Sequence, residues 1–172
     1  MGEAGKGRLA AIGLGSNLAS GFGDREANLW EAVRRVGALG RVEAVSSFYD
    51  TAPVGYVEQP RFLNGAMLLE TELAPLEVMR GMLAVEREMG RVRGVAKGPR
   101  VIDLDLLLYG DVVMVTDELV LPHPEMERRG FVLEPLAEIA AAMVHPVLGV
   151  TVGDLKRRGL PAGPTARGAV TS

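Results

Sequence analysis

The chain contains no cysteine, which excludes disulfide bonds, thiolate metal sites and cysteine nucleophiles. It has little aromatic content, with only one tryptophan, three tyrosines and four phenylalanines in 172 residues. Neither sign of charge dominates, and the net charge of −3 argues against a general nucleic-acid-binding surface. No apolar run approaches the ~18 to 20 residues that a membrane span requires. We therefore expect a cytoplasmic protein that binds neither nucleic acid nor membrane.

The common glycine-rich nucleotide motifs are also missing. The segment GVAKGPR (94–100) lacks the P-loop spacing, and no G-x-G-x-x-G dinucleotide fingerprint occurs. Both histidines, His123 and His145, precede prolines and belong to no evident nucleophile triad or metal cluster. If the protein handles phosphates, it must use other side chains.

Hydrophobic periodicity predicts a single α+β domain over 8–158, with residues 1–7 and 159–172 as flexible ends. The expected order is strand, helix, strand, strand, helix, strand. These elements are expected at 8–15, 24–39, 41–51, 62–71, 74–90 and 101–110. A small hairpin and two further helices, near 131–140 and 151–158, form a C-terminal extension. The order is that of a ferredoxin-like βαββαβ core, an antiparallel sheet with helices packed on it.

Two aspartates interrupt the last strand of this core. Side chains alternate across a strand, so Asp103 and Asp105 share one face. The opposite face is apolar and is expected to meet the core; it consists of Ile102, Leu104, Leu106 and Leu108. Two like charges about 6 to 7 Å apart repel by roughly 2.5 kcal/mol at an effective dielectric near 20. A cation between them relieves this, and Asp-x-Asp suits Mg²⁺. The alternative is an exposed strand end with two solvated acids.

A cationic segment leads directly into this strand. Arg91, Arg93, Lys97 and Arg100 occur there, and no acid intervenes before Asp103. Such a segment beside a carboxylate pair fits polyphosphate chemistry, because guanidinium groups neutralise charge on the phosphates. The alternative is an ordinary solvated loop.

Glu86 lies on the same face of the second predicted helix as Met82 and Leu83. A carboxylate on an apolar face needs a partner, either in the arginine segment or in a metal-bound water. The alternative is a plain salt bridge at the end of the helix.

Six segments, in this order along about residues 9–157, together carry a family resemblance. They are GLGSNL (13–18), SSFYDTAPVG (46–55), QPRFLNGA (59–66), GRVR (90–93), GPRVIDLDLLLYG (98–110) and LPHPEMERRGFVLEPL (121–136). With them the chain resembles the 6-hydroxymethyl-7,8-dihydropterin pyrophosphokinases of folate biosynthesis. The resemblance implies transfer of the β,γ-pyrophosphoryl group of ATP to the hydroxymethyl oxygen of the pterin, with release of AMP.

The resemblance also implies roles for individual residues. Asp103 and Asp105 match the carboxylates that bind two Mg²⁺ ions, and Arg91 and Arg100 match the catalytic arginines. The positions that match nucleotide contacts are Glu86, Arg93, Lys97, Arg100, Leu106, His123 and Arg129. The positions that match pterin contacts are Thr51, Ala52, Val54, Phe62, Asn64 and Phe131, the two phenylalanines stacking on the ring. From the residues alone, phenylalanines at these positions are more often ordinary core residues. A monomer is expected for this family.

Some positions depart from certain members of that family. Lys97 stands where some carry a tryptophan, Phe62 where a tyrosine is common, and Glu118 where one type has a nucleotide-contacting arginine. Val120 replaces a hydroxyl residue. These changes concern nucleotide affinity and loop closure and leave the expected reaction unchanged.

Two other functions share the expected fold. A small-molecule sensor without turnover would need the fold and a pocket, but gives no reason for Asp-x-Asp beside arginines. An RNA-recognition module shares the element order, but needs strand aromatics and basic character that this chain lacks.

Overall fold

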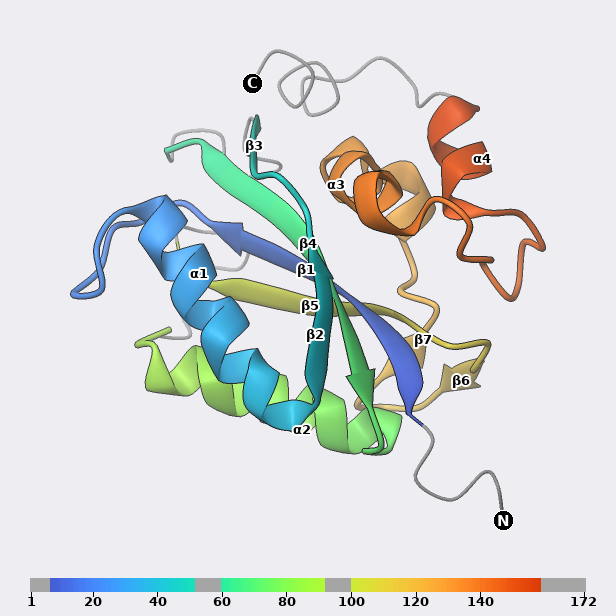
Figure 1. Ribbon diagram of the computed structural model, residues 1–172, viewed down its shortest axis with the longest axis horizontal. Coiled ribbons are helices and arrows are strands. Elements are labelled where there is room, and N and C mark those ends of the chain that lie inside the picture. The colour runs from blue at the N-terminus through green and yellow to red at the C-terminus, as the bar shows by residue number, and fades with distance from the viewer. Residues whose placement is uncertain (1–6, 52–59, 92–99, 159–172) are drawn as a thin grey trace.

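The computed structural model describes residues 7–51, 60–91 and 100–158. Its centre is an antiparallel sheet in the order β2–β4–β1–β5, with the short β3 also paired to β4 (Figure 1). The strands are β1 (Arg8–Ser16), β2 (Arg41–Val45), β3 (Tyr49–Thr51), β4 (Phe62–Thr71) and β5 (Asp103–Tyr109). This is the strand order of a ferredoxin-like core, so the predicted fold class is confirmed.

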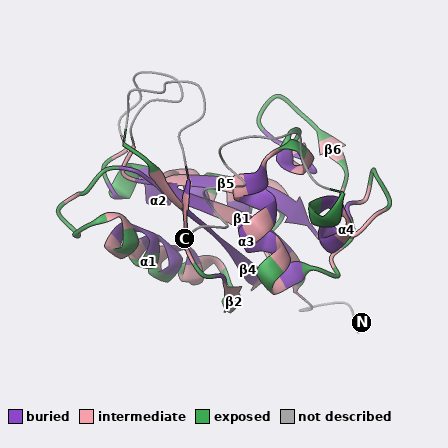
Figure 2. Ribbon diagram, turned by 90° about the horizontal axis from the view of Figure 1, so that it is seen from above, coloured by how far each residue is buried: buried purple, intermediate pink, exposed green. Residues whose placement is uncertain are grey.

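Helices cover both faces of the sheet. The helices α1 (Arg25–Val36) and α2 (Pro75–Glu88) pack on one face, while α3 (Gly130–Ala140) and α4 (Val152–Arg157) lie on the other (Figures 1 and 2). Between them come two 3₁₀ turns, Gly37–Leu39 and Met126–Arg128, and a hairpin of β6 (Met114–Val115) and β7 (Val120–Leu121). No helix within the described ranges is long and apolar enough to cross a membrane.

Local sequence signals set the ends of the helices. Asp24 caps α1, because its carboxylate accepts a 2.9 Å hydrogen bond from the Ala27 amide. Pro75 occupies the first turn of α2, where its missing N–H costs nothing. Thr151 caps α4 by accepting from the Asp154 amide at 3.0 Å. These short-range signals explain why α1, α2 and α4 could be predicted from the sequence.

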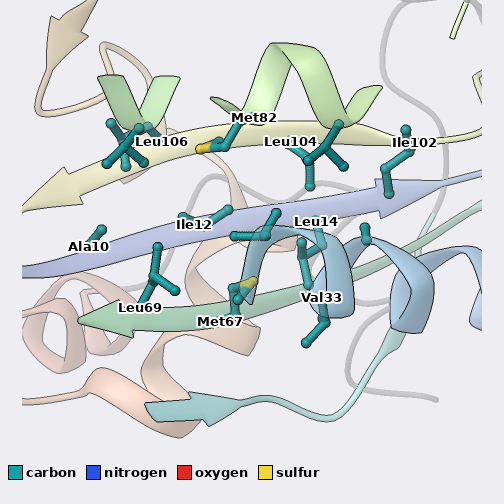
Figure 3. Close-up of a cluster of buried hydrophobic side chains, with 14 of the residues drawn as sticks. Ala10, Ile12, Leu14, Val33, Met67, Leu69, Met82, Ile102, Leu104 and Leu106 are labelled. Atoms are coloured by element: carbon teal, nitrogen blue, oxygen red, sulfur yellow. The ribbon is translucent and has the colours of Figure 1, made fainter. Parts of the chain in front are cut away.

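Two apolar cores stabilise the sheet, one on each face. Ile12, Met67 and Leu104 face α1 and α2 in the first core, shown in Figure 3. Leu107 of β5 and Leu133 of α3 belong to the second core, on the face that α3 and α4 cover. The central strands are therefore buried from both sides, and α3 covers part of the face that also carries the two aspartates.

A bulge in β5 changes which face its residues occupy. Ala11 pairs with Leu108 but Ile12 pairs with Leu106, so Leu107 is an extra residue in β5. Ile102, Leu104 and Leu106 lie in the first core, as expected. Leu108 joins Leu107 in the second core, and Tyr109 moves to the first. The prediction of one uninterrupted alternation, with Leu108 on the face of Leu104, is therefore wrong.

The predicted strand over 41–51 is two strands, β2 and β3. Ser46 separates them: its hydroxyl accepts from the Ala66 amide at 2.9 Å, while its own amide donates to the Ala66 carbonyl at 2.9 Å. The Ser46 side chain thus accepts a hydrogen bond that a backbone carbonyl would accept in a continuous strand. The break lets β3 run along β4 toward the end of the sheet where the candidate site lies.

We expect Ile12→Ala to lower the free energy of unfolding by about 2 to 5 kcal/mol, because it opens a cavity at a fully buried side chain. Val115→Ala, at a residue that is 80% exposed, should change it by less than about 0.5 kcal/mol. Urea denaturation of both variants measures the difference. Equal effects would contradict the described core.

Candidate active site

The predicted site residues gather at one end of the sheet, where β1 and β3 end and β4 and β5 begin. The register places Gly15 of β1 opposite Asp103 on one side and opposite Asn64 on the other. Thr51 of β3 lies opposite Phe62. Four strands therefore bring together residues that are far apart in the sequence.

Gly15 leaves room for the side chains around it. A Cβ atom at Gly15 would lie 2.9 Å from Asn64 Oδ1, 3.7 Å from Phe62 Cδ1 and 3.9 Å from the Asp103 Cβ. The expected pterin residues and the expected metal residue thus converge over one glycine. At Gly13 the same atom would be no closer than 3.5 Å to Leu107, an ordinary van der Waals contact.

The part of the site where the pterin is expected is partly pre-formed. Asn64 is buried, and its amide donates a hydrogen bond to the hydroxyl of buried Thr51. Phe62 and Phe131 are each half-buried, and Phe131 packs on the second core with the Arg129 guanidinium 5.6 Å from its ring centre. Both rings keep accessible surface, which fits a stacking role better than a purely structural one.

Glu138 holds α3, and with it Phe131, against β3. Its carboxylate accepts from the Ser47 amide at 2.9 Å and from the Tyr49 hydroxyl at 2.8 Å. Because α3 begins next to Phe131, this contact sets the position of that ring relative to the strands.

The catalytic half is a network of acids and arginines. Glu86, near the end of α2, is 4% exposed and accepts from the Leu104 amide at 2.7 Å. The same oxygen accepts from Arg91 Nη1 at 2.8 Å, and that nitrogen lies 3.0 Å from Asp103 Oδ1. Arg100 Nη1 lies 3.4 Å from the same Asp103 oxygen. The two predicted catalytic arginines and Asp103 are therefore in direct contact.

The pKa values of Glu86 and Asp105 reflect how closely the acids lie together around Asp103. Burial raises the pKa of Glu86, although the Leu104 amide and Arg91 oppose the shift. Burial and then the negative charge of Asp103 raise the pKa of Asp105. Burial and the nearby Arg129 lower the pKa of His123, whose Nε2 lies 3.9 Å from Asp105 Oδ1. A bound cation would relieve the repulsion between the two aspartates.

A cavity of about 310 Å³ adjoins Asp105, between α2, β5 and the β6–β7 hairpin. Leu106 and His123, both expected at the nucleotide, line it. Glu118, at its rim, forms a 2.6 Å ion pair with Arg80 of α2. Arg129, the other described residue expected at the nucleotide, pairs with Glu125 at 2.8 Å. The remaining expected positions, Ala52, Val54, Arg93 and Lys97, lie outside the described residues.

One residue without an assigned role in the sequence occupies a central place. Asn17 is 2% exposed and lies directly after β1. Its side chain contacts the backbone at both Pro60 and Arg100. Its place inside the GLGSNL segment is the one sequence signal that could have singled it out.

The comparison with protein families decides the assignment. The model of the family described as 7,8-dihydro-6-hydroxymethylpterin-pyrophosphokinase (HPPK) matches residues 11–141. The chain belongs to the HPPK family. The pterin pyrophosphokinase expected from the sequence is thereby confirmed at the level of the family.

Curated HPPK relatives of similar length support this. The 2-amino-4-hydroxy-6-hydroxymethyldihydropteridine pyrophosphokinase of Bacillus subtilis is 47% identical over 133 residues, 76% of this chain and 77% of its own. That of Pseudomonas aeruginosa is 44% identical over 135 residues, 78% and 82% of the two chains.

The chain spans only part of some longer relatives and structures. The folic acid synthesis protein fol1 of Schizosaccharomyces pombe is 38% identical over 144 residues, but the chain spans only 19% of its length. A solved HPPK-DHPS structure from Plasmodium falciparum superposes with a TM-score of 0.72 at 16% identity, covering 91% of this chain and 44% of that one. This structural likeness supports the HPPK fold.

We expect Gly15→Ala to weaken pterin binding about fivefold to tenfold, because the added methyl group displaces the Asn64 amide and costs roughly one hydrogen bond. Gly13→Ala, two residues earlier on β1, is the matched control and should bind pterin normally. Fluorescence titration with the pterin measures both. Equal affinities would show that the convergence over Gly15 does not matter for binding.

Proposed function

We propose that the chain transfers the β,γ-pyrophosphoryl group of ATP to the hydroxymethyl oxygen of 6-hydroxymethyl-7,8-dihydropterin and releases AMP. A bond forms between this oxygen and the β-phosphorus of ATP, the bond from that phosphorus to the α,β-bridging oxygen breaks, and the hydroxyl proton leaves. We also propose that the working state is a cytoplasmic monomer. The observation that carries the proposal is the row Asp103–Gly15–Asn64 across three strands, which sets Asp103 and its two arginines beside the side chains of Asn64 and Phe62.

The pterin half offers recognition without charge. Asn64 has both an amide donor and a carbonyl acceptor, which suits the pyrimidinone edge of a pterin, and Thr51 holds that amide in place. Phe62 and Phe131 would stack on the flat ring. This combination selects a flat, polar heteroaromatic ring over an aliphatic substrate.

The nucleotide half offers a cavity that leads to the acids. The apolar walls from Met82 and Leu106 suit a nucleobase, and Asp105 and His123 lie at the wall nearest the sheet edge. A nucleotide in this cavity would have its phosphates directed toward Arg91 and Arg100. The Glu118–Arg80 pair would border the base.

The donor set at Asp103 and Asp105 fits Mg²⁺. Carboxylate oxygens are hard ligands, and Mg²⁺ commonly takes one or two of them and completes its shell with water and phosphate oxygens. Within the described ranges, no three His, Cys, Asp or Glu side chains are arranged so that they could together hold a metal ion. The proposed ligands are the carboxylates of Asp103 and Asp105 together with substrate oxygens. Bound Mg²⁺ would supply charge neutralisation of the triphosphate.

The chain's own residues contribute positioning and electrostatic stabilisation. Arg91 and Arg100 present guanidinium groups at the edge of the acid pair, where they can stabilise negative charge that develops on the transferred group. Glu86 anchors Arg91 from the buried side. No strong base is needed at the hydroxymethyl oxygen, because phosphoryl transfer has a loose transition state.

The direct test is to mix the protein, ATP, Mg²⁺ and 6-hydroxymethyl-7,8-dihydropterin and to follow nucleotides by chromatography. AMP should form only when the pterin and Mg²⁺ are both present, and removal of Mg²⁺ with a chelator should stop it. Asp105→Asn, which keeps the size but removes the charge, should nearly abolish AMP formation. ADP as the product would indicate an ordinary kinase, and ATP binding without turnover would favour a sensor.

We expect Arg91→Ala to lower kcat by about 10³-fold while both KM values change by less than about threefold, because its charge acts mainly in the transition state. Arg91→Lys should recover only part of kcat, since it keeps the charge but loses the planar guanidinium whose Nη1 contacts both Glu86 and Asp103. Arg34→Ala, an exposed arginine paired to Glu31, is the control. Equal losses in kcat and in affinity would make Arg91 a binding residue instead.

A further inference from the structure

Within the described ranges, Asn17 makes three hydrogen bonds to two distant parts of the chain. Its Nδ2 donates to the Pro60 carbonyl at 3.0 Å, and its Oδ1 accepts from the Arg100 amide at 2.8 Å. Its own backbone amide donates to the Arg100 carbonyl at 3.1 Å. The side chain is 2% exposed, so water cannot replace these partners at low cost.

The two parts that Asn17 joins belong to different halves of the site. Pro60 lies two residues before Phe62, on the pterin side. Arg100 lies three residues before Asp103 and contacts it, on the phosphate side. Pro60 and Arg100 are thus both held through contacts to one side chain.

An amide is the side chain suited to this position. Pro60 offers only a carbonyl here, which needs a donor, and the Arg100 amide needs an acceptor. Asparagine supplies one of each from a single planar group, and its short stem holds that plane firmly. A carboxylate would satisfy Arg100 but repel the Pro60 carbonyl, while an alanine would satisfy neither.

We propose that Asn17 is a positioning residue that fixes the pterin-side anchor at Pro60 and the phosphate-side anchor at Arg100 relative to each other. This rests on the proposed pyrophosphoryl transfer. In that reaction the hydroxymethyl oxygen must meet the phosphorus in line, and its placement depends on Phe62, whereas the phosphate placement depends on Arg100. Asn17 therefore acts on the distance between the two substrates more than on the binding of either one.

The experiment compares Asn17→Ala, Asn17→Asp and Asn28→Ala with the unmodified chain. Asn28 is the matched control: it is fully buried on α1, and its amide donates to the Leu18 carbonyl at 2.7 Å and to Ser16 Oγ at 3.3 Å, so it supports the chain on either side of Asn17 through bonds to neither Pro60 nor Arg100. Asn17→Ala and Asn28→Ala each remove one buried amide, so each variant reports the general cost in stability. Thermal unfolding identifies the temperature at which all variants are folded.

In the kinetic arm we expect Asn17→Ala to lower kcat about 10²-fold, because misplacement of reactants by about 1 Å costs that much. Each substrate alone should still bind within about threefold of normal, as measured by calorimetry with ATP and with the pterin. Asn28→Ala should keep kcat within about threefold of normal. A loss in Asn17→Ala no larger than in Asn28→Ala, or one that appears equally in binding, would overturn the proposal.

A second arm needs no substrate. Amide exchange followed by NMR should show a protected Arg100 amide in the unmodified chain and in Asn17→Asp, where an acceptor remains, but rapid exchange in Asn17→Ala. The signal of Arg61, next to Pro60, should shift in both Asn17 variants and stay unchanged in Asn28→Ala. If the unmodified chain forms no AMP, the proposed function fails while this arm still decides the positioning role. A protected Arg100 amide in Asn17→Ala would refute it.

Discussion

The register of β1 between β4 and β5 is the constraint on which the rest of the site depends. It sets Gly15 between Asn64 and Asp103, so that groups from three strands meet where a side chain would otherwise stand. A slip of one residue would turn every side chain of the strand to the other face. The apolar residues of β1, such as Ile12 in the first core and Ala11 in the second, fix the register because each would lose its burial in a slip.

The edge position of β5 explains how Glu86 enters the site. An edge strand leaves every second N–H without a neighbouring strand. The Leu104 amide is such a group, and Glu86 of α2 accepts from it. Because that carboxylate is buried, it also attracts Arg91, which then reaches Asp103. Glu86 thus has two effects. It satisfies a free N–H at the edge of the sheet, and it holds an arginine beside Asp103, where phosphate chemistry needs one. The plain salt bridge considered from the sequence is present, and it is part of this network.

The parts of the fold that follow from local signals could be predicted from the sequence. Capping by Asp24, the helical spacing of Leu29 and Val33, and the alternation at Asp103 and Asp105 all act within a few residues. The misses came from contacts between distant residues. The break at Ser46 depends on the Ala66 backbone, and the face of Leu108 depends on its pairing with Ala11. The role inferred for Asn17 likewise depends on partners 43 and 83 residues away, which no spacing rule reveals.

The bulge at Leu107 divides β5 into two segments that obey separate rules of alternation. Upstream of it, odd-numbered positions carry the acids and even-numbered positions fill the core beneath α2; downstream, that parity is reversed. The face on which Asp103 and Asp105 lie is therefore set separately from the faces on which Leu108 and Tyr109 pack. Changes that repack Leu108 or Tyr109 under their own helices do not pass along the strand as a change of face at Asp103 or Asp105. A single short strand can thus be under two independent sets of selective demands, one for reactivity and one for stability.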